Sequence, residues 1–219
     1  MQVLKFGGSS VADAQNMSKV VDIVIKAVDR DRTILVVSAI SGCTDTLIKI
    51  GTLASERDES YKTLIDKLQQ RHHDIINELL PREKQNESLA VCDSLFDSLR
   101  SITQGVFLLG ELSPASLDAI QSFGELWSTK ILATKLASIG ISTKWIDSRQ
   151  IIRTVAKGDK NVVDVQKTYY RVNEMVESNR ITQLFVLPGF IASDKQGRTP
   201  TLGRGGSDYT ASLYAVGCK

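Results

Sequence analysis

The sequence predicts an α/β fold in which helices sandwich a mainly parallel sheet. Three short, largely apolar runs predict strands, at residues 2–6, 33–38 and 182–187. Long segments with helical periodicity separate these runs, and strands that alternate with helices form parallel sheets through right-handed crossovers. The run at 33–38 is continuous and β-branched, which is typical of a strand buried on both faces.

The first predicted helix begins near Asp13. Apolar residues recur there at helical spacing, so one face should pack on a core: Met17, Val20, Val21, Val24, Ile25 and Val28. A second helix should begin at Thr44, whose hydroxyl is expected to cap it. The buried side of this second helix is predicted to carry Leu47, Ile48 and Ile50.

A helical hairpin is predicted over about residues 58–110. Two apolar stripes at helical spacing, within 61–79 and 89–102, lie on either side of Pro81, which divides the two helices. We expect this hairpin to pack against the sheet domain or to be inserted into it.

Downstream of the hairpin, Ser113 and Pro114 have the cap and first-turn signature of a long helix, which we expect to break near Gly124. The following segments are predicted, in chain order, as a strand at 141–146, a helical turn at 150–154, a polar connection at 161–164, a helix at 165–177, a hairpin turn at Gly197 between Ile191 and Thr201, and a last helix after 205–208.

The composition excludes several classes of function. The 219 residues carry 27 Lys and Arg against 25 Asp and Glu, a net charge of +2, whereas a general nucleic-acid binder carries a basic excess. No apolar run approaches the ~20 residues that span a bilayer. The N-terminus lacks the pattern of a signal peptide, so we expect a cytoplasmic protein that contacts no membrane.

The cysteines and histidines predict no metal or redox site. Cys43, Cys92 and Cys218 lack C-x-x-C spacing and are expected to be reduced thiols, buried or half-buried. His72 and His73 are adjacent in a polar helical stretch, so they point to different sides of the helix. We expect them to form a solvated surface pair.

Lys5 lies near the end of the first strand, and Gly7, Gly8, Ser9 and Ser10 follow that strand. Glycines let backbone N–H groups approach a phosphate closely, and the N-terminus of a following helix adds partial positive charge. Lys5 would neutralise charge on a transferring phosphoryl group. A plain tight turn with a surface lysine explains the same residues, so this motif alone leaves both interpretations open.

A second glycine cluster, T-L-G-R-G-G-S-D-Y-T, spans residues 201–210. Arg204 can bind a carboxylate through two parallel hydrogen bonds, and Asp208 could orient Lys5 or another lysine by an ion pair. A helix entry in which Asp208 only complements the helix dipole is the alternative, but it leaves the arginine and three glycines unexplained. Asp208 stands where a dinucleotide fingerprint has its last glycine, which disfavours a Rossmann site.

Two weaker signals complete the set. Glu125 follows a glycine in an apolar helical zone, where an unpaired carboxylate is costly, and it could receive an amino group. A surface or helix-capping glutamate is the commoner interpretation of such a residue. Ser38 and Thr44 place hydroxyl groups at a strand exit and at the next helix start, which suits a small polar ligand as well as ordinary caps.

Together these segments resemble the aspartate kinase family of the amino-acid kinase superfamily. K-F-G-G-S-S-V, V-S-A-x-x-G-x-T-D, the central G-E and T-L-G-R-G-G-S-D-Y-T-A all occur in the family's order. The stretch W-I-D-S-R at 145–149 is most similar to the single-function, lysine-regulated type. The resemblance implies an amino-acid kinase (carbamate kinase-like) fold, of which residues 1–219 would be the N-terminal portion.

The resemblance implies phosphorylation of the L-aspartate β-carboxylate by ATP, the first step of lysine, threonine and methionine biosynthesis. Mg²⁺ should arrive on the nucleotide, because the sequence shows no dedicated protein metal cage. The implied roles are catalysis by Lys5 and Asp208, phosphate binding by Lys5, Gly7, Gly8 and Ser9, and aspartate binding by Ser38, Thr44, Glu125, Phe190, Arg204, Gly205 and Ser207.

The family also has a strand and loops for adenine and ribose, and regulatory ACT domains, which would lie outside residues 1–219. We therefore expect this chain alone to be inactive, and the full-length enzyme to be a homodimer or a larger assembly. Two alternatives stay open: a kinase of the superfamily with another acceptor, such as glutamate, and a non-catalytic module that binds aspartate or phosphate.

Overall fold

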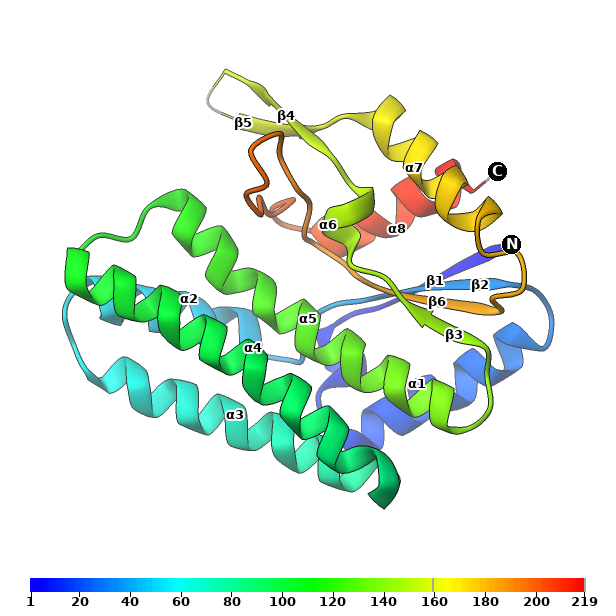
Figure 1. Ribbon diagram of the computed structural model, residues 1–219, viewed down its shortest axis with the longest axis horizontal. Helices are drawn as coiled ribbons and strands as arrows, with labels where there is room; N and C mark the ends of the chain where they lie inside the picture. Colours follow the sequence, from blue (N-terminus) through cyan, green and yellow to red (C-terminus); the bar gives the residue numbers. More distant parts are fainter. Residues whose placement is uncertain (159, 219) are drawn as a thin grey trace.

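A computed structural model describes residues 1–158 and 160–218 (Figure 1). It contains a four-stranded sheet with helices on both faces and a separate two-stranded hairpin. The elements are β1 (Gln2–Phe6), the 3₁₀ helix η1 (Gly8–Val11), α1 (Ala14–Val28), β2 (Thr33–Val37), α2 (Cys43–Ser55), α3 (Ser60–Leu79), α4 (Arg82–Leu109), α5 (Pro114–Ser138), β3 (Thr143–Trp145), α6 (Ser148–Ile151), β4 (Thr154–Lys157), β5 (Lys160–Val163), α7 (Val165–Glu177), β6 (Leu184–Pro188) and α8 (Gly206–Gly217).

The larger sheet is parallel, with strand order β1-β2-β6-β3. Every residue of β2 and β6 is buried, because both strands lie inside the sheet and helices cover both faces (Figure 1). Along β2 the side chains alternate between two cores: Leu35 and Val37 pack with α1 and α5, and Ile34 and Val36 pack with α7 and α8. The predicted sandwich of helices around a parallel sheet is confirmed.

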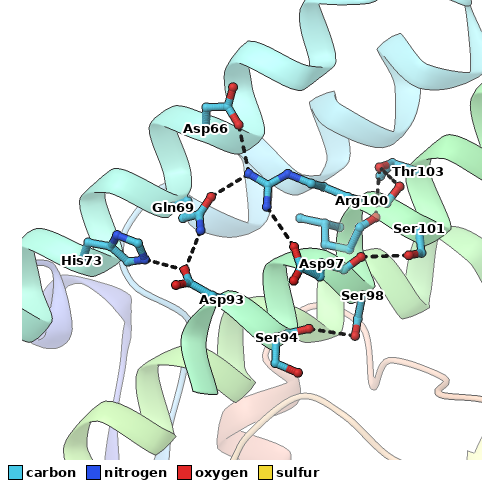
Figure 2. Close-up of polar contacts among 11 residues, drawn as sticks. Asp66, Gln69, His73, Asp93, Ser94, Asp97, Ser98, Arg100, Ser101 and Thr103 are labelled. Carbon is cyan, nitrogen blue, oxygen red and sulfur yellow. Dashed lines mark hydrogen bonds and ion pairs between the residues drawn. The ribbon is translucent and has the colours of Figure 1, made fainter. Parts of the chain in front are cut away.

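α3 and α4 form the predicted helical hairpin, and Pro81 separates them. The hairpin packs on α2 and α5, on the side of the sheet that also holds α1 (Figure 1). Figure 2 shows a polar network that joins its two helices: Asp93 of α4 accepts hydrogen bonds from Gln69 and His73 of α3, and Arg100 contacts Gln69 and Asp66. These contacts fix α3 against α4.

The prediction of a solvated histidine pair is wrong for His72. This side chain is fully buried, and its ring centroid lies 5.7 Å from that of Phe96 and 4.8 Å from that of Trp127. Its Nδ1 lies 2.8 Å from the carbonyl oxygen of Leu68. Burial lowers the pKa of His72 to about 4. A neutral imidazole therefore fills the core between the hairpin and α5.

The predicted break near Gly124 is also wrong, because α5 runs without interruption from 114 to 138. A Cβ atom on Gly124 would lie 2.7 Å from the Cβ of Ala39 and 3.2 Å from the Sγ of Cys43. The glycine therefore serves a close approach between α5 and the loop after β2, and it does not end the helix.

The start of α2 differs from the prediction as well. The helix begins at Cys43, after Gly42 turns the chain with a left-handed φ of 74°. Thr44 thus lies inside the helix and does not cap it. Ile48, expected on the buried side, is 36% exposed, whereas Leu47 and Ile50 are buried as predicted.

The segment from 150 to 164 holds a β-hairpin that the sequence pattern did not predict. α6 ends at Ile151, and β4 and β5 then pair in antiparallel fashion. The expected helical turn is present as α6, about two residues earlier than predicted, and the hairpin replaces the expected polar connection. Val155 is only partly buried and Lys157 is exposed, so β4 lacks the apolar run by which the inner strands were recognised.

The thiols behave as predicted from their spacing. Cys43 and Cys92 are buried and Cys218 is half-buried. Burial raises the pKa of the Cys92 thiol to about 12, so this thiol is protonated and unreactive at neutral pH. Within residues 1–158 and 160–218, no helix is both long enough and apolar enough to cross a membrane.

Candidate active site

A cleft of about 470 Å³ opens where the loops after β1, β2 and β6 meet the start of α8. Ligands of parallel α/β sheets bind at this carboxyl end of the strands. Gly7 and Ser9 do not line the cleft. The other predicted site residues all line it: Lys5, Gly8, Ser38, Thr44, Glu125, Phe190, Arg204, Gly205, Ser207 and Asp208.

A second, more apolar groove of about 290 Å³ lies between α4, α5 and β3. Trp127, Trp145 and Lys130 line it, and none of the predicted site residues does. The predicted site residues therefore converge on the first cleft, which we take as the candidate active site.

Lys5 and Asp208 form an ion pair in the lining of the cleft. The Lys5 Nζ lies 2.8 Å from the Asp208 Oδ1, although 203 positions separate the two residues in the sequence. Lys5 stands at the carboxyl end of β1, and Asp208 lies in the first turn of α8, where an acidic side chain also complements the helix dipole. The structure thus brings the first and last predicted motifs together.

The loop after β1 is shaped by close backbone contacts. A Cβ on Gly8 would lie 2.9 Å from the carbonyl oxygen of Ala39, so a larger residue would push the loops after β1 and β2 apart. A Cβ on Gly7 would come within 3.5 Å of the Lys5 Nζ. Gly7 caps η1 and Ser9 is exposed, which places both beside the cleft and not on its wall.

The loop before α8 depends on left-handed backbone. Gly203 and Gly205 have φ values of 72° and 74°, and Phe190, which faces them, has a φ of 67°. Such a φ is strained for a phenylalanine and persists only where surrounding contacts impose it. Here the Phe190 N–H donates to the Thr210 hydroxyl, and a Cβ on Gly206 would lie 2.8 Å from the Phe190 ring. Phe190 and the Arg204 loop therefore hold each other in place.

Glu125 projects from α5 and is only 3% exposed. Its Oε2 has no hydrogen-bond partner among the residues that the structure describes. Burial raises the pKa of Glu125 to about 8, although a hydrogen bond from the Ala39 backbone opposes the shift. The commoner interpretation, a surface or capping glutamate, is thus wrong: this is a buried carboxyl group at a polar cleft.

Arg204 is exposed at the mouth of the cleft. Across residues 1–158 and 160–218, no carboxylate forms an ion pair with its guanidinium group. An unpaired arginine and a buried acid that line one cleft are complementary to a small ligand that carries both a carboxylate and an ammonium group.

One contact at the site was not predicted. Asp118, near the start of α5, accepts a hydrogen bond of 2.7 Å from the Thr201 hydroxyl and so ties α5 to the loop that carries Arg204. Burial raises the pKa of Asp118, and the Thr201 hydroxyl opposes this. The only signal in the sequence is that Asp118 precedes Glu125 by seven residues, which places both on one face of a helix.

The comparisons with known proteins agree with this geometry. The chain matches the description "Amino acid kinase family" over residues 1–219. It is 32% identical to lysine-sensitive aspartokinase 3 of Escherichia coli over 97% of this chain and 45% of that protein. It is 28% identical to bifunctional aspartokinase/homoserine dehydrogenase 1 of Arabidopsis thaliana, over 98% of this chain and 23% of that protein.

Solved structures give the same relationship. The crystal structure of E. coli aspartokinase III in complex with aspartate and ADP superimposes with a TM-score of 0.87 at 29% identity, over 99% of this chain and 46% of that one. The same enzyme in complex with lysine and aspartate gives a TM-score of 0.88 at 30% identity, over 99% and 47%. This chain spans less than half the length of each of these relatives. Because the family description covers every residue, the chain belongs to the amino acid kinase family.

Proposed function

We propose that this chain forms the acceptor and phosphate-binding part of an aspartate kinase, which transfers the γ-phosphoryl group of ATP to the β-carboxylate of L-aspartate. The products are 4-phospho-L-aspartate and ADP. The observation that carries the proposal is the meeting of the Lys5–Asp208 ion pair, the buried Glu125 and the unpaired Arg204 in one cleft. The related E. coli enzyme, whose crystals contain aspartate and ADP, supports it.

The acceptor side of the cleft fits an α-amino acid. Arg204 would bind the α-carboxylate through its two-pronged guanidinium group, and Glu125 would receive the α-ammonium group. Their separation in the cleft would leave the β-carboxylate directed toward Lys5. Five further lining residues would complete the aspartate pocket: Ser38, Thr44, Phe190, Gly205 and Ser207.

The phosphate side fits an anion that carries several negative charges. Lys5 would stabilise the transferring phosphoryl group, and Asp208 would hold the lysine in position. Gly7, Gly8 and Ser9 would bind ATP phosphates through their backbone N–H groups, and the tight packing of Gly8 on Ala39 leaves no space for a side chain at this position. Mg²⁺, bound to the nucleotide, would supply further neutralisation of the phosphate charge.

The chemistry requires no general base, because the β-carboxylate is already ionised at neutral pH. The barrier arises from bringing two anions together. Lys5 offsets this repulsion, and the cleft holds the reacting groups in line. The activity is proposed for a chain that also carries the part of the aspartokinase relatives beyond the region matched here.

An assay for ATP-dependent acyl phosphates tests the proposal. The full-length protein is incubated with MgATP and one amino acid, and the product is trapped with hydroxylamine as the hydroxamate. We expect product with L-aspartate, little with L-glutamate, and none from the Lys5→Ala variant. Equal product with glutamate would instead support another kinase of the superfamily. Aspartate binding without any product would support the non-catalytic module.

A further inference from the structure

Arg71 lies in the middle of α3, far from the cleft in sequence but next to two of its loops in space. Its guanidinium group donates one hydrogen bond of 2.8 Å from Nη1 to the carbonyl oxygen of Ser41. It donates a second bond of 2.8 Å from Nη2 to the carbonyl oxygen of Ala12. One side chain of the helical hairpin thus grips two loops that belong to the sheet domain.

These two carbonyl groups belong to the loops after β1 and β2, both of which contribute residues to the lining of the cleft. Ala12 closes η1, the short helix that follows Lys5 and Gly8. Ser41 lines the cleft itself and precedes the left-handed Gly42 at the start of α2. The loops also touch each other, because a Cβ on Gly8 would lie 3.4 Å from the Ser41 backbone. The two hydrogen bonds from Arg71 therefore reinforce an existing contact between the loop after β1, on the phosphate side, and the loop after β2, on the acceptor side.

Neighbouring residues on α3 fix the turn that carries Arg71 against α4 and the core. Gln69 and His73 hydrogen-bond to Asp93 of α4 (Figure 2). At 100° per residue, Arg71 projects from the opposite side of the helix, away from α4. His72 anchors the same turn in the core against Phe96 and Trp127. The direction of the Arg71 side chain is thus fixed by its neighbours in the helix.

The charge of Arg71 is available to the loops. In the part of the chain that the structure describes, no carboxylate forms an ion pair with it, so no acidic side chain competes with the two carbonyl groups for this charged donor. The charge also acts on the buried Cys43 thiol at the start of α2, where it opposes the rise that burial and Glu125 impose on the pKa of Cys43.

We propose that Arg71 is a positioning residue, which holds the phosphate-binding loop and the acceptor loop at a fixed separation from outside the cleft. This proposal rests on the proposed kinase function for its kinetic consequence, but the clamp itself is a structural statement that can be tested without catalysis. It assigns the helical hairpin a part in organising the active site, beyond its contribution to the hydrophobic core.

Hydrogen–deuterium exchange on the full-length protein tests the clamp directly. In Arg71→Met, amides at residues 8–12 and 40–44 should exchange about tenfold faster than in the wild type, because the charged bonds that hold both loops are lost. Arg100→Met is the matched control: it removes a cation from the same hairpin and breaks contacts shown in Figure 2, but it reaches neither loop. Its exchange at these loops should match the wild type.

The Arg71→Lys variant tests whether the loops are held by the paired donors of the guanidinium group or by its positive charge alone. A lysine keeps the positive charge but lacks the rigid pair of donors, so both loops should still loosen. If Arg71→Lys and Arg71→Met both exchange like the wild type, the clamp does not exist. If Arg100→Met loosens the loops as much as Arg71→Met, general softening of the hairpin explains the effect and the proposal is overturned.

Steady-state kinetics supply the functional arm. We expect Arg71→Met to raise the KM for MgATP several-fold and to lower kcat/KM by about tenfold or more, because small displacements of reacting groups are costly. Partial unfolding alone lowers kcat and leaves KM unchanged, so an unchanged KM for MgATP would refute a positioning role. A wild-type protein without aspartate kinase activity would refute the proposed function, whereas the exchange experiment would still decide the clamp.

Discussion

Glu125 makes the proposed binding of aspartate depend on pH in a way that can be calculated. Burial raises its pKa to about 8 in the empty cleft, so at pH 7 only about one molecule in eleven carries the ionised carboxylate. An ammonium group bound beside it favours the charged form and lowers that pKa. Aspartate binding at pH 7 should therefore release about 0.9 proton per site, and the affinity should rise about tenfold between pH 7 and pH 9.

Isothermal titration calorimetry measures this release. Aspartate is titrated into the protein at pH 7 in buffers with different ionisation enthalpies, and the slope of the observed enthalpy against ionisation enthalpy gives the number of protons. Glu125→Gln is the control, because the amide cannot ionise and its release should fall to near zero. Binding with no proton release in the wild type, or with the same release in Glu125→Gln, would refute the assignment of Glu125 to the ammonium group.

Three further predictions concern other residues. Lys5→Ala in the full-length enzyme should lower kcat by about a hundredfold or more with little change in the KM for aspartate, and an unchanged kcat would remove Lys5 from the mechanism. Arg204→Ala should mainly raise the KM for aspartate, so kinetics in which only the KM for ATP changes would contradict its role. Protonation would place a charge in the core at His72, so the stabilising effect of its neutral form is complete above pH 6.5 and is lost as the pH falls toward about 4. Between about pH 7.5 and pH 5 this loss amounts to roughly 2 kcal/mol, which urea unfolding should detect as a change with pH in the stability difference between the wild type and His72→Leu, because the opposite contribution of Glu125 is common to both and cancels.

The sheet and most helices could be predicted because buried strands and helices carry apolar residues in regular patterns. β2 is a run of apolar and β-branched residues because both of its faces are covered. α3 and α4 each bury one stripe, and Pro81 marks the boundary between them. The β4–β5 hairpin has partly exposed strands, so its sequence lacks the continuous apolar run that marks the inner strands.

The first and last motifs of the site could be predicted from the sequence, whereas the contacts that hold its loops and helices in place could not. The Lys5 motif carries a glycine that a close backbone contact requires, the Asp208 motif carries glycines that left-handed backbone requires, and the ion pair between the two motifs was predicted. The contacts of Asp118 and Arg71 carry no local signal, because each depends on a partner more than 25 residues away in the chain. The burial of His72 depends likewise on rings that α4 and α5 supply.

Replacing Gly124 by alanine should change the free energy of unfolding in opposite directions, depending on whether this glycine breaks the helix or serves a close packing contact. If this glycine were a helix breaker, alanine would stabilise the chain by about 1 kcal/mol through helix propensity. In the structure a Cβ there would lie 2.7 Å from the Ala39 Cβ, and overpacking of this kind costs about 1–3 kcal/mol. Gly124→Ala should therefore destabilise the chain or leave it no more stable.

Gly105 provides the matched control for this substitution. It lies inside α4, and a Cβ at that position would meet no atom within 4 Å. Gly105→Ala should therefore show the propensity gain of about 1 kcal/mol without a clash. Thermal unfolding of both variants and of the wild type measures whether each alanine raises or lowers the stability. Equal stabilisation by the two alanines would show that α5 does not press on the Ala39 loop, and the buried setting of Glu125 that depends on this contact would then have to be abandoned.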